Sequence, residues 1–125
     1  MEDKAYKIGQ FSNQVKLSID TLRYYEKEKL IVPKRDQNNR RIYDESDLRW
    51  IEFIKRLKQT GMPIKEIQQY SQLRYQGDST INERLELLYQ QKERLAAESA
   101  ELAQHIAFLN HKIGVYQAKL KRYDH

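Results

Sequence analysis

Residues 18–30 read SIDTLRYYEKEKL, a short segment in which an arginine precedes two adjacent tyrosines. Ser18 is suited to cap a helix, and Asp20 would lie in the first turn, where a negative charge is stabilised. The apolar face of this helix would hold Ile19, Leu22 and Tyr25. An Arg-Tyr-Tyr run is awkward for a core and unfavourable on a bare surface, so the segment raises the question of what it contacts.

A second short helix precedes this segment, with apolar residues at Ile8, Phe11 and Val15. The tight link VKLS, residues 15–18, joins the two helices. Two short helices joined in this way are typical of a helix-turn-helix unit, although the pattern alone is common. Pro33 ends the unit.

A basic hairpin is predicted next, in VPKRDQNNRRIY, residues 32–43. Asparagine tolerates a positive φ, so Asn38-Asn39 between two short arms is a turn signal. Residues 34–41 carry four positive charges and one negative charge. Such a run is usually a solvated loop. Beside a helix-turn-helix unit it is better interpreted as a wing (residues 32–43) that grips phosphates.

Two further helices are predicted after the wing. Asp44 is suited to cap the third helix, Gly61 ends it, and Pro63 begins the fourth. Lys65, beside the turn at residues 61–63, would belong to a second basic loop. The third helix would supply the main core with Leu48, Trp50, Ile51, Phe53, Ile54 and Leu57, and the fourth repeats apolar residues at Ile64, Ile67, Tyr70 and Leu73.

The region after Gly77 predicts one long helix. It has no proline and no glycine before Gly114, and Thr80 with Glu83 has the spacing of a capping box. Apolar residues follow a heptad rhythm over about six repeats, which indicates a coiled coil. A helix from about residue 80 to 123 is roughly 65 Å long. The predicted dimer contacts are Ile81, Leu85, Leu88, Leu95, Leu102, Ile106, Leu109, Ile113, Tyr116 and Leu120.

These heptad residues form one apolar stripe along the helix, which we call the seam. A small domain alone cannot bury the seam, so it needs a partner helix, and a homodimer is the economical interpretation. Lys92 and Ser99 interrupt the seam. Buried polar seam residues often fix register and oligomeric state. The same two residues would equally be a weak point in the coil. The heptad pattern does not decide whether the two helices run parallel or antiparallel.

Charge is divided unevenly along the chain. Residues 1–77 hold 16 Lys+Arg against 11 Asp+Glu, a net charge of +5, whereas residues 78–125 hold 7 against 7. This favours a polyanionic partner for a first domain, residues 1–77, and packing for a second domain, residues 78–125. With no apolar run of the roughly 18 residues that cross a bilayer and no signal-peptide pattern, the sequence predicts a cytoplasmic protein.

Nearly the whole chain resembles the MerR family of bacterial transcription regulators. The resemblance is carried by YKIGQFS, LSIDTLRYYEKEKLIVPKR, RRIYDESDL, LKQTGMPIKEI and the terminal coiled coil, in the family's order. Each fragment is weak alone, but the combination is highly specific. Within the family, WIEFIKRLKQTGMPI, LRYQGDST and KIGVY are most similar to the small subgroup linked to aldehyde and nitrosative stress.

The resemblance implies a mainly α fold: a winged helix-turn-helix head with a small β-hairpin wing, followed by a long dimerising coiled-coil helix. Residues 18–30 would include a recognition helix in the major groove, where arginine reads guanine and tyrosine hydroxyls reach phosphates. The expected DNA contacts are Ser18, Thr21, Arg23, Tyr24, Tyr25, Arg35, Arg40, Arg41, Tyr43 and Lys65. The alternative is that Tyr25 is mostly core and only Tyr24 contacts DNA.

The chain departs from the family pattern at several positions. Lys16, Lys29 and Asn39 stand where the family usually has glycine. Left-handed backbone angles at the two lysines would each cost about 1 kcal/mol, and we hypothesise that this strain is offset by phosphate contact. Arg40 replaces the usual aromatic of the wing. Arg56 stands where the stress-linked subgroup commonly has a cysteine, and this chain has no cysteine, so thiol sensing and disulfides are excluded.

No cofactor, metal or catalytic site is predicted. His105 and His111 are six residues apart on one helix, too far round to chelate together. No nucleophile–base set or phosphate-binding glycine loop is found, so an enzyme is not expected. A small apolar effector could bind near Tyr70, Tyr75 and Tyr89, although such tyrosines are more often packing residues.

The sequence therefore predicts a homodimeric, sequence-specific regulator of double-stranded promoter DNA that binds a pseudo-palindromic site. MerR-like proteins typically bind between the −35 and −10 elements of a promoter whose spacer is overlong. They bend and untwist this spacer so that RNA polymerase can engage both elements, which would make the polymerase an indirect partner. One alternative is an architectural protein that bends DNA without controlling transcription. Another is a coiled-coil adaptor, which would leave the charge asymmetry unexplained.

Overall fold

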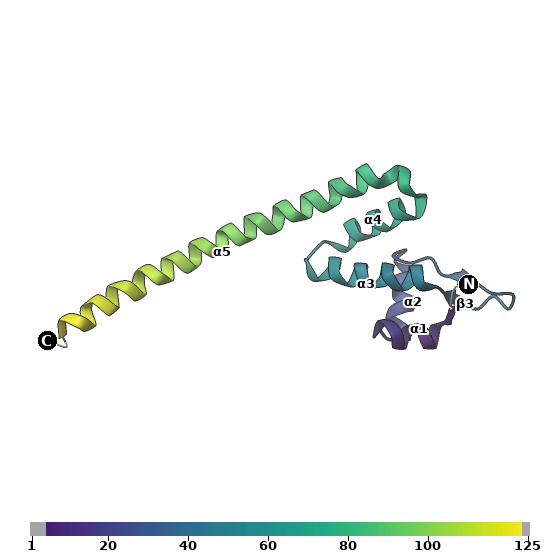
Figure 1. Ribbon diagram of the computed structural model, residues 1–125, viewed down its shortest axis with the longest axis horizontal. Coiled ribbons are helices and arrows are strands. Elements are labelled where there is room, and N and C mark those ends of the chain that lie inside the picture. The colour runs from purple at the N-terminus through teal and green to yellow at the C-terminus, as the bar shows by residue number, and fades with distance from the viewer. Residues whose placement is uncertain (1–4, 124–125) are drawn as a thin grey trace. The chain divides into compact units, whose positions relative to one another are not determined.

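The computed structural model describes residues 5–123, which form a small three-stranded sheet and a succession of helices (Figure 1). They divide into two compact units, one that ends at Leu88 and one that begins at Tyr89. We call the first unit the head. In chain order the elements are β1 (Tyr6–Lys7), α1 (Ile8–Val15), α2 (Ile19–Lys27), β2 (Lys34–Arg35), β3 (Arg41–Tyr43), α3 (Glu45–Gln59), α4 (Ile64–Gln76), a 3₁₀ turn (Asp78–Thr80) and α5 (Ile81–Tyr123).

The helix-turn-helix unit forms as the local sequence predicts. The Ser18 hydroxyl accepts a hydrogen bond from the Thr21 amide at 3.0 Å, which caps α2. Lys16 turns the chain between the helices with φ 56°. The Lys55 ammonium of α3 donates to the Val15 carbonyl at 2.8 Å and so satisfies the end of α1.

The predicted hairpin is confirmed, and its turn is organised by one carboxylate. Asp36 Oδ1 accepts hydrogen bonds from the amides of Asn38 and Arg40, both at 2.9 Å, and Asn39 adopts φ 60°. The sheet order is β1-β3-β2, with both pairs antiparallel. Strand β1 was not predicted, because two residues are too few to show an alternating pattern of apolar and polar side chains.

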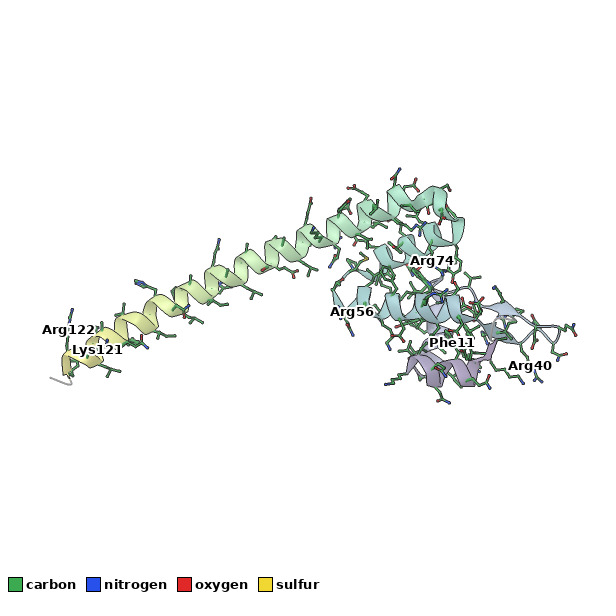
Figure 2. All side chains as sticks on the ribbon, viewed as in Figure 1. Phe11, Arg40, Arg56, Arg74, Lys121 and Arg122 are labelled. Carbon is green, nitrogen blue, oxygen red and sulfur yellow. The ribbon has the colours of Figure 1, made fainter. Side chains whose placement is uncertain are left out.

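One hydrophobic core joins α1, α2, β3, α3 and α4 in the head. Phe11 of α1 is fully buried and stacks on the Tyr43 ring of β3, with centroids 4.1 Å apart (Figure 2 labels Phe11). Trp50 Nε1 donates to the Leu30 carbonyl at 2.8 Å, which holds the loop after α2 against α3. The prediction that α3 supplies much of the core is confirmed, except that Phe53 is partly exposed.

The start of α5 agrees with the prediction, but not through a capping box. The Thr80 hydroxyl donates to the carbonyls of Leu73 and Gly77, at 2.5 and 2.8 Å, and therefore secures the end of α4. Leu87 is buried and Leu88 is packed against the core of the head. The head thus extends beyond the predicted boundary at residue 77, and Leu88, expected at a dimer contact, also has an internal packing role.

The second unit is the remainder of α5, which carries the apolar seam. Seam side chains such as Leu102, at 61% exposure, and Leu109 and Ile113 are exposed in the isolated chain. Exposed leucine and isoleucine at heptad spacing are what a coiled coil leaves open before its partner is added. Within residues 5–123, no helix is long and apolar enough to cross a membrane.

Candidate nucleic-acid interface

Helix α2 presents two of the predicted contact residues to solvent. The Arg23 guanidinium is 3.8 Å from the Asp20 carboxylate, and both side chains are largely exposed, so this ion pair is weak. Tyr24 is 48% exposed. An exposed arginine next to an exposed tyrosine can supply a hydrogen-bonding fork and a hydroxyl to one partner surface.

Ser18 and Thr21 lie at the N-terminal end of α2, as predicted. Their hydroxyl oxygens are 2.8 Å apart, so the two groups share a hydrogen bond as well as forming the cap. Four backbone amides are left without helical partners at such an end. This end of α2 therefore combines amide donors with two hydroxyl groups.

Tyr25 corrects one prediction. Its side chain is 3% exposed and belongs to the core, so the alternative interpretation, with Tyr24 as the outward residue, holds. The Lys58 ammonium lies 5.1 Å from the centre of the Tyr25 ring and 3.3 Å from its hydroxyl. One residue along a helix rotates the side chain by about 100°, which is why adjacent tyrosines separate in this way.

The wing carries three of the predicted arginines in two different environments. Arg40 is exposed, and Figure 2 shows it on the loop that closes the hairpin. Arg35 and Arg41 lie on the two strands and both pair with Glu26 of α2, at 3.0 and 2.6 Å. Sequence reasoning missed Glu26, although its position one turn after Arg23 and before a basic hairpin was an available signal.

A hollow of about 330 Å³ lies beside the wing. It is lined by Lys7, Ile8, Arg35, Asn39, Arg40 and Arg41. The predominance of cationic side chains makes this hollow suited to an anionic group. Lys65, the other predicted contact, is exposed in the first turn of α4.

Tyr43 corrects a second prediction, because its side chain is 2% exposed. Its hydroxyl is buried and has no hydrogen-bond partner among the described residues. Burial raises the pKa of this phenol to about 12, with the Glu26 carboxylate as a further cause. Tyr43 therefore stays a neutral core residue that supports the wing from beneath through its stack on Phe11.

Replacing Tyr43 by phenylalanine is expected to stabilise the protein by up to about 1 kcal/mol, because it removes a buried hydroxyl without a partner. Tyr25→Phe is the matched control. It deletes a hydroxyl that accepts a hydrogen bond from Lys58, so it should destabilise slightly. Urea unfolding of both variants checks the signs. A loss of stability in Tyr43→Phe would mean that its hydroxyl has a partner in solution.

Comparison with known proteins agrees with this architecture. A family model described as "MerR HTH family regulatory protein" matches residues 6–73, and one described as "MerR, DNA binding" matches residues 48–112. The chain belongs to the MerR family.

The similarity to individual relatives extends over most of this chain. An uncharacterised HTH-type transcriptional regulator of Haemophilus influenzae is 35% identical over 114 residues, which are 90% of this chain and 84% of the relative. The HTH-type transcriptional regulator AdhR of Bacillus subtilis is 42% identical over 89 residues, 70% of this chain and 64% of AdhR. These relatives are described as transcriptional regulators, not as enzymes.

Two solved MerR structures are similar over nearly their full length. One is HiNmlR, described as a MerR family regulator lacking the sensor domain and bound to promoter DNA. It has a TM-score of 0.72 and 33% identity, and the similarity covers 91% of each chain. The other is a regulator from Listeria monocytogenes that has a TM-score of 0.74 and 30% identity, with 95% of this chain and 96% of that chain covered.

The departures from the MerR glycine pattern have the expected backbone conformation. Lys16, Lys29 and Asn39 have φ values of 56°, 61° and 60°, all in the left-handed region. At the end of α2, the amides of Lys29 and Leu30 donate to carbonyls of the last turn, which is the bonding that favours a left-handed residue there. Both lysines therefore adopt a left-handed conformation of the kind that glycine adopts without strain.

Lys29→Gly is expected to stabilise the protein by about 1 kcal/mol, because glycine adopts the left-handed region without strain. The same variant should bind DNA more weakly if the lysine contacts phosphate. Lys29→Ala is the matched control, since it removes the charge and keeps the strain. Thermal unfolding and a binding titration measure the two effects separately. Unchanged binding in both variants would remove the phosphate-contact hypothesis.

The sequence raised a metal ion and a small apolar effector as candidate ligands. In the part of the chain from residue 5 to 123, no group of three or more His, Cys, Asp or Glu side chains is placed to hold a metal ion. His105 lies 3.7 Å from Glu101 on the same helix. Tyr70 stacks on Trp50 at 5.9 Å, and Tyr75 meets the same ring edge-on, so these two tyrosines are packing residues in the head.

Proposed function

We propose that this MerR regulator works as a homodimer whose two heads bind a pseudo-palindromic promoter site and distort the DNA between them. The observation that carries the proposal is the combination on one head of α2, with exposed Arg23 and Tyr24, and a wing with Arg35, Arg40 and Arg41. An arginine fork matches the acceptors of guanine in the major groove, and basic wings contact phosphates.

Promoter DNA is the partner supported best. HiNmlR, which is similar over 91% of both chains, is described as bound to promoter DNA. The excess of basic residues also lies in the part of the chain that forms most of the head, with 16 Lys+Arg against 11 Asp+Glu in residues 1–77. The contacts would be largely ionic, so affinity should fall steeply as salt concentration rises.

A second copy of the chain is the partner proposed for the seam of α5. The exposed Leu102, Leu109 and Ile113 would be buried between two helices. A symmetric dimer binds symmetric half-sites, and heads that enter successive major grooves on one face of DNA are about 34–36 Å apart or a multiple of that distance.

Distortion of the spacer is the proposed route to control. Bending or untwisting DNA costs a few kcal/mol, which phosphate contacts from both wings would offset. RNA polymerase would then be affected indirectly, through the altered spacing of the promoter elements. A protein that acts on promoter DNA in this way would work in the bacterial cytoplasm.

Selection of bound sites from a random duplex pool, followed by permanganate footprinting on the matching native promoter, tests the proposal. We expect a pseudo-palindrome across a long promoter spacer, with central base pairs made reactive. Enrichment of no symmetric site, with salt-sensitive binding to any duplex, would instead indicate an architectural DNA-bending protein.

A further inference from the structure

Glu26 joins the recognition helix to both strands of the wing. Its Oε1 accepts a hydrogen bond from Arg35 Nη2 of β2 at 3.0 Å, and its Oε2 accepts one from Arg41 Nε of β3 at 2.6 Å. Each carboxylate oxygen therefore holds a different arginine. The Glu26 and Arg41 side chains are 23% and 28% exposed, so water screens this pair less than a surface pair.

The hydrogen bonds leave donors available on both arginines. Arg41 uses only Nε among the described residues, so its two terminal amino groups remain for another acceptor. Arg35 uses its terminal amino groups, on Glu26 and on the Asn39 carbonyl at 3.4 Å, and keeps Nε. Guanidinium groups fixed in this way have already lost much of the side-chain entropy that binding would otherwise remove.

Both arginines line the basic hollow beside the wing, together with Lys7 and Arg40. One carboxylate against two guanidinium groups leaves the cluster positive. An anionic phosphate of the DNA backbone has a size and a charge that suit such a hollow, and arginine binds phosphate through two parallel hydrogen bonds. The geometry therefore prepares the wing arginines for a phosphate without cancelling their charge.

We propose that Glu26 is a positioning residue for DNA binding, which aligns Arg35 and Arg41 to bind a backbone phosphate at the hollow. The inference rests on the proposed function. It predicts a change in DNA affinity, on removal of the Glu26 charge, that is opposite in sign to the change expected from charge repulsion alone. A negative side chain near a polyanion should weaken binding, so its removal should help; a positioning carboxylate should weaken binding when it is removed.

The test compares Glu26→Gln with Glu28→Gln in the full chain, titrated against the selected operator duplex at several salt concentrations. Glu28 is the matched control: it directly follows α2 as its C-cap residue, is also half-buried, and accepts a hydrogen bond from Gln68 at 2.9 Å instead of from an arginine. We expect Glu26→Gln to bind about tenfold more weakly. The slope of log K against log salt should become shallower by at least about 0.9, the value for one lost phosphate contact.

Three further readouts complete the test. Glu26→Asp, which keeps the charge on a shorter arm, should recover part of both losses. Thermal unfolding of Glu26→Gln shows whether the head stays folded at the titration temperature. Glu28→Gln should bind at least as tightly as wild type, because it loses only a repulsive charge. Tighter binding by folded Glu26→Gln, or an unchanged salt slope, would overturn the positioning role.

Failure of this inference differs from failure of the proposed function. If wild type selects a symmetric operator and Glu26→Gln binds it equally well, only the positioning role is wrong. If wild type selects no symmetric site, the proposed function is wrong whatever the variant does. The salt slope on a random-sequence duplex then still shows whether Glu26 aligns the arginines toward phosphate, because that contact does not depend on sequence.

Discussion

Replacing Leu102 and Leu109 together by aspartate is expected to convert the protein to a monomer and to lower operator affinity by roughly 10²–10⁴-fold. Both leucines occupy the seam of α5 and are exposed in the isolated chain. In a dimer, carboxylates at these positions would face apolar side chains across the interface, where an unpaired charge is strongly unfavourable. Each head would then bind alone and lose the gain from being tethered to its partner.

Gln104→Asp with His111→Asp is the control for this variant. It introduces the same two acidic residues with the same seven-residue spacing on the same helix, but at positions two residues beyond each seam leucine. This control should stay dimeric and bind the operator with near wild-type affinity, apart from a small electrostatic loss. Light scattering measures the mass and a gel shift measures affinity. A seam variant that remains dimeric would show that the dimer uses another surface.

Phe11→Ala should destabilise the head by about 3–5 kcal/mol, the range for truncating a buried phenylalanine. Phe11 is 0% exposed, stacks on Tyr43 and is the aromatic residue through which α1 holds β3. Whole domains are stable by only about 5–15 kcal/mol. We therefore expect a large drop in melting temperature, and weaker operator binding at temperatures where part of the population is unfolded.

Phe108→Ala is the control for this second variant, because it makes the same truncation at a side chain that is 73% exposed and lies off the seam. Its effect should stay within about 0.5 kcal/mol. Urea unfolding of both variants, monitored by far-ultraviolet circular dichroism, which reports the helices of both units, compares the two losses. Similar losses in both variants would mean that Phe108 is covered in the dimer or that Phe11 is less tightly packed than its stack on Tyr43 indicates.

Most of the fold was predictable because the deciding residues act locally. Ser18 and Asp44 cap their helices through hydrogen bonds to amides three residues on, and Asp36 with Asn39 closes the wing within one turn. Periodicity of apolar residues likewise depends on one helix at a time. The long seam of α5 can be recognised without knowledge of tertiary contacts, because its seven-residue repeat is visible in the amino-acid sequence.

The errors concern contacts between distant residues. Tyr24 and Tyr25 are the same amino acid at adjacent positions. Only the packing of α2 against the core decides which of the two is buried. Tyr43 was interpreted as a wing contact, but the stack on Phe11, thirty-two positions earlier, turns it inward. The pairing of Glu26 with Arg35 and Arg41 also depends on the hairpin folding back onto α2.

Trp50 has a practical consequence for following this molecule in solution. It is the only tryptophan in the sequence, it is buried, and it touches the loop after α2 through its bond to Leu30 and α4 through Tyr70. The Arg74 guanidinium lies 4.5 Å from its ring centre and would polarise its excited state. Its emission therefore reports the integrity of the head, so one optical signal follows the melting of that unit.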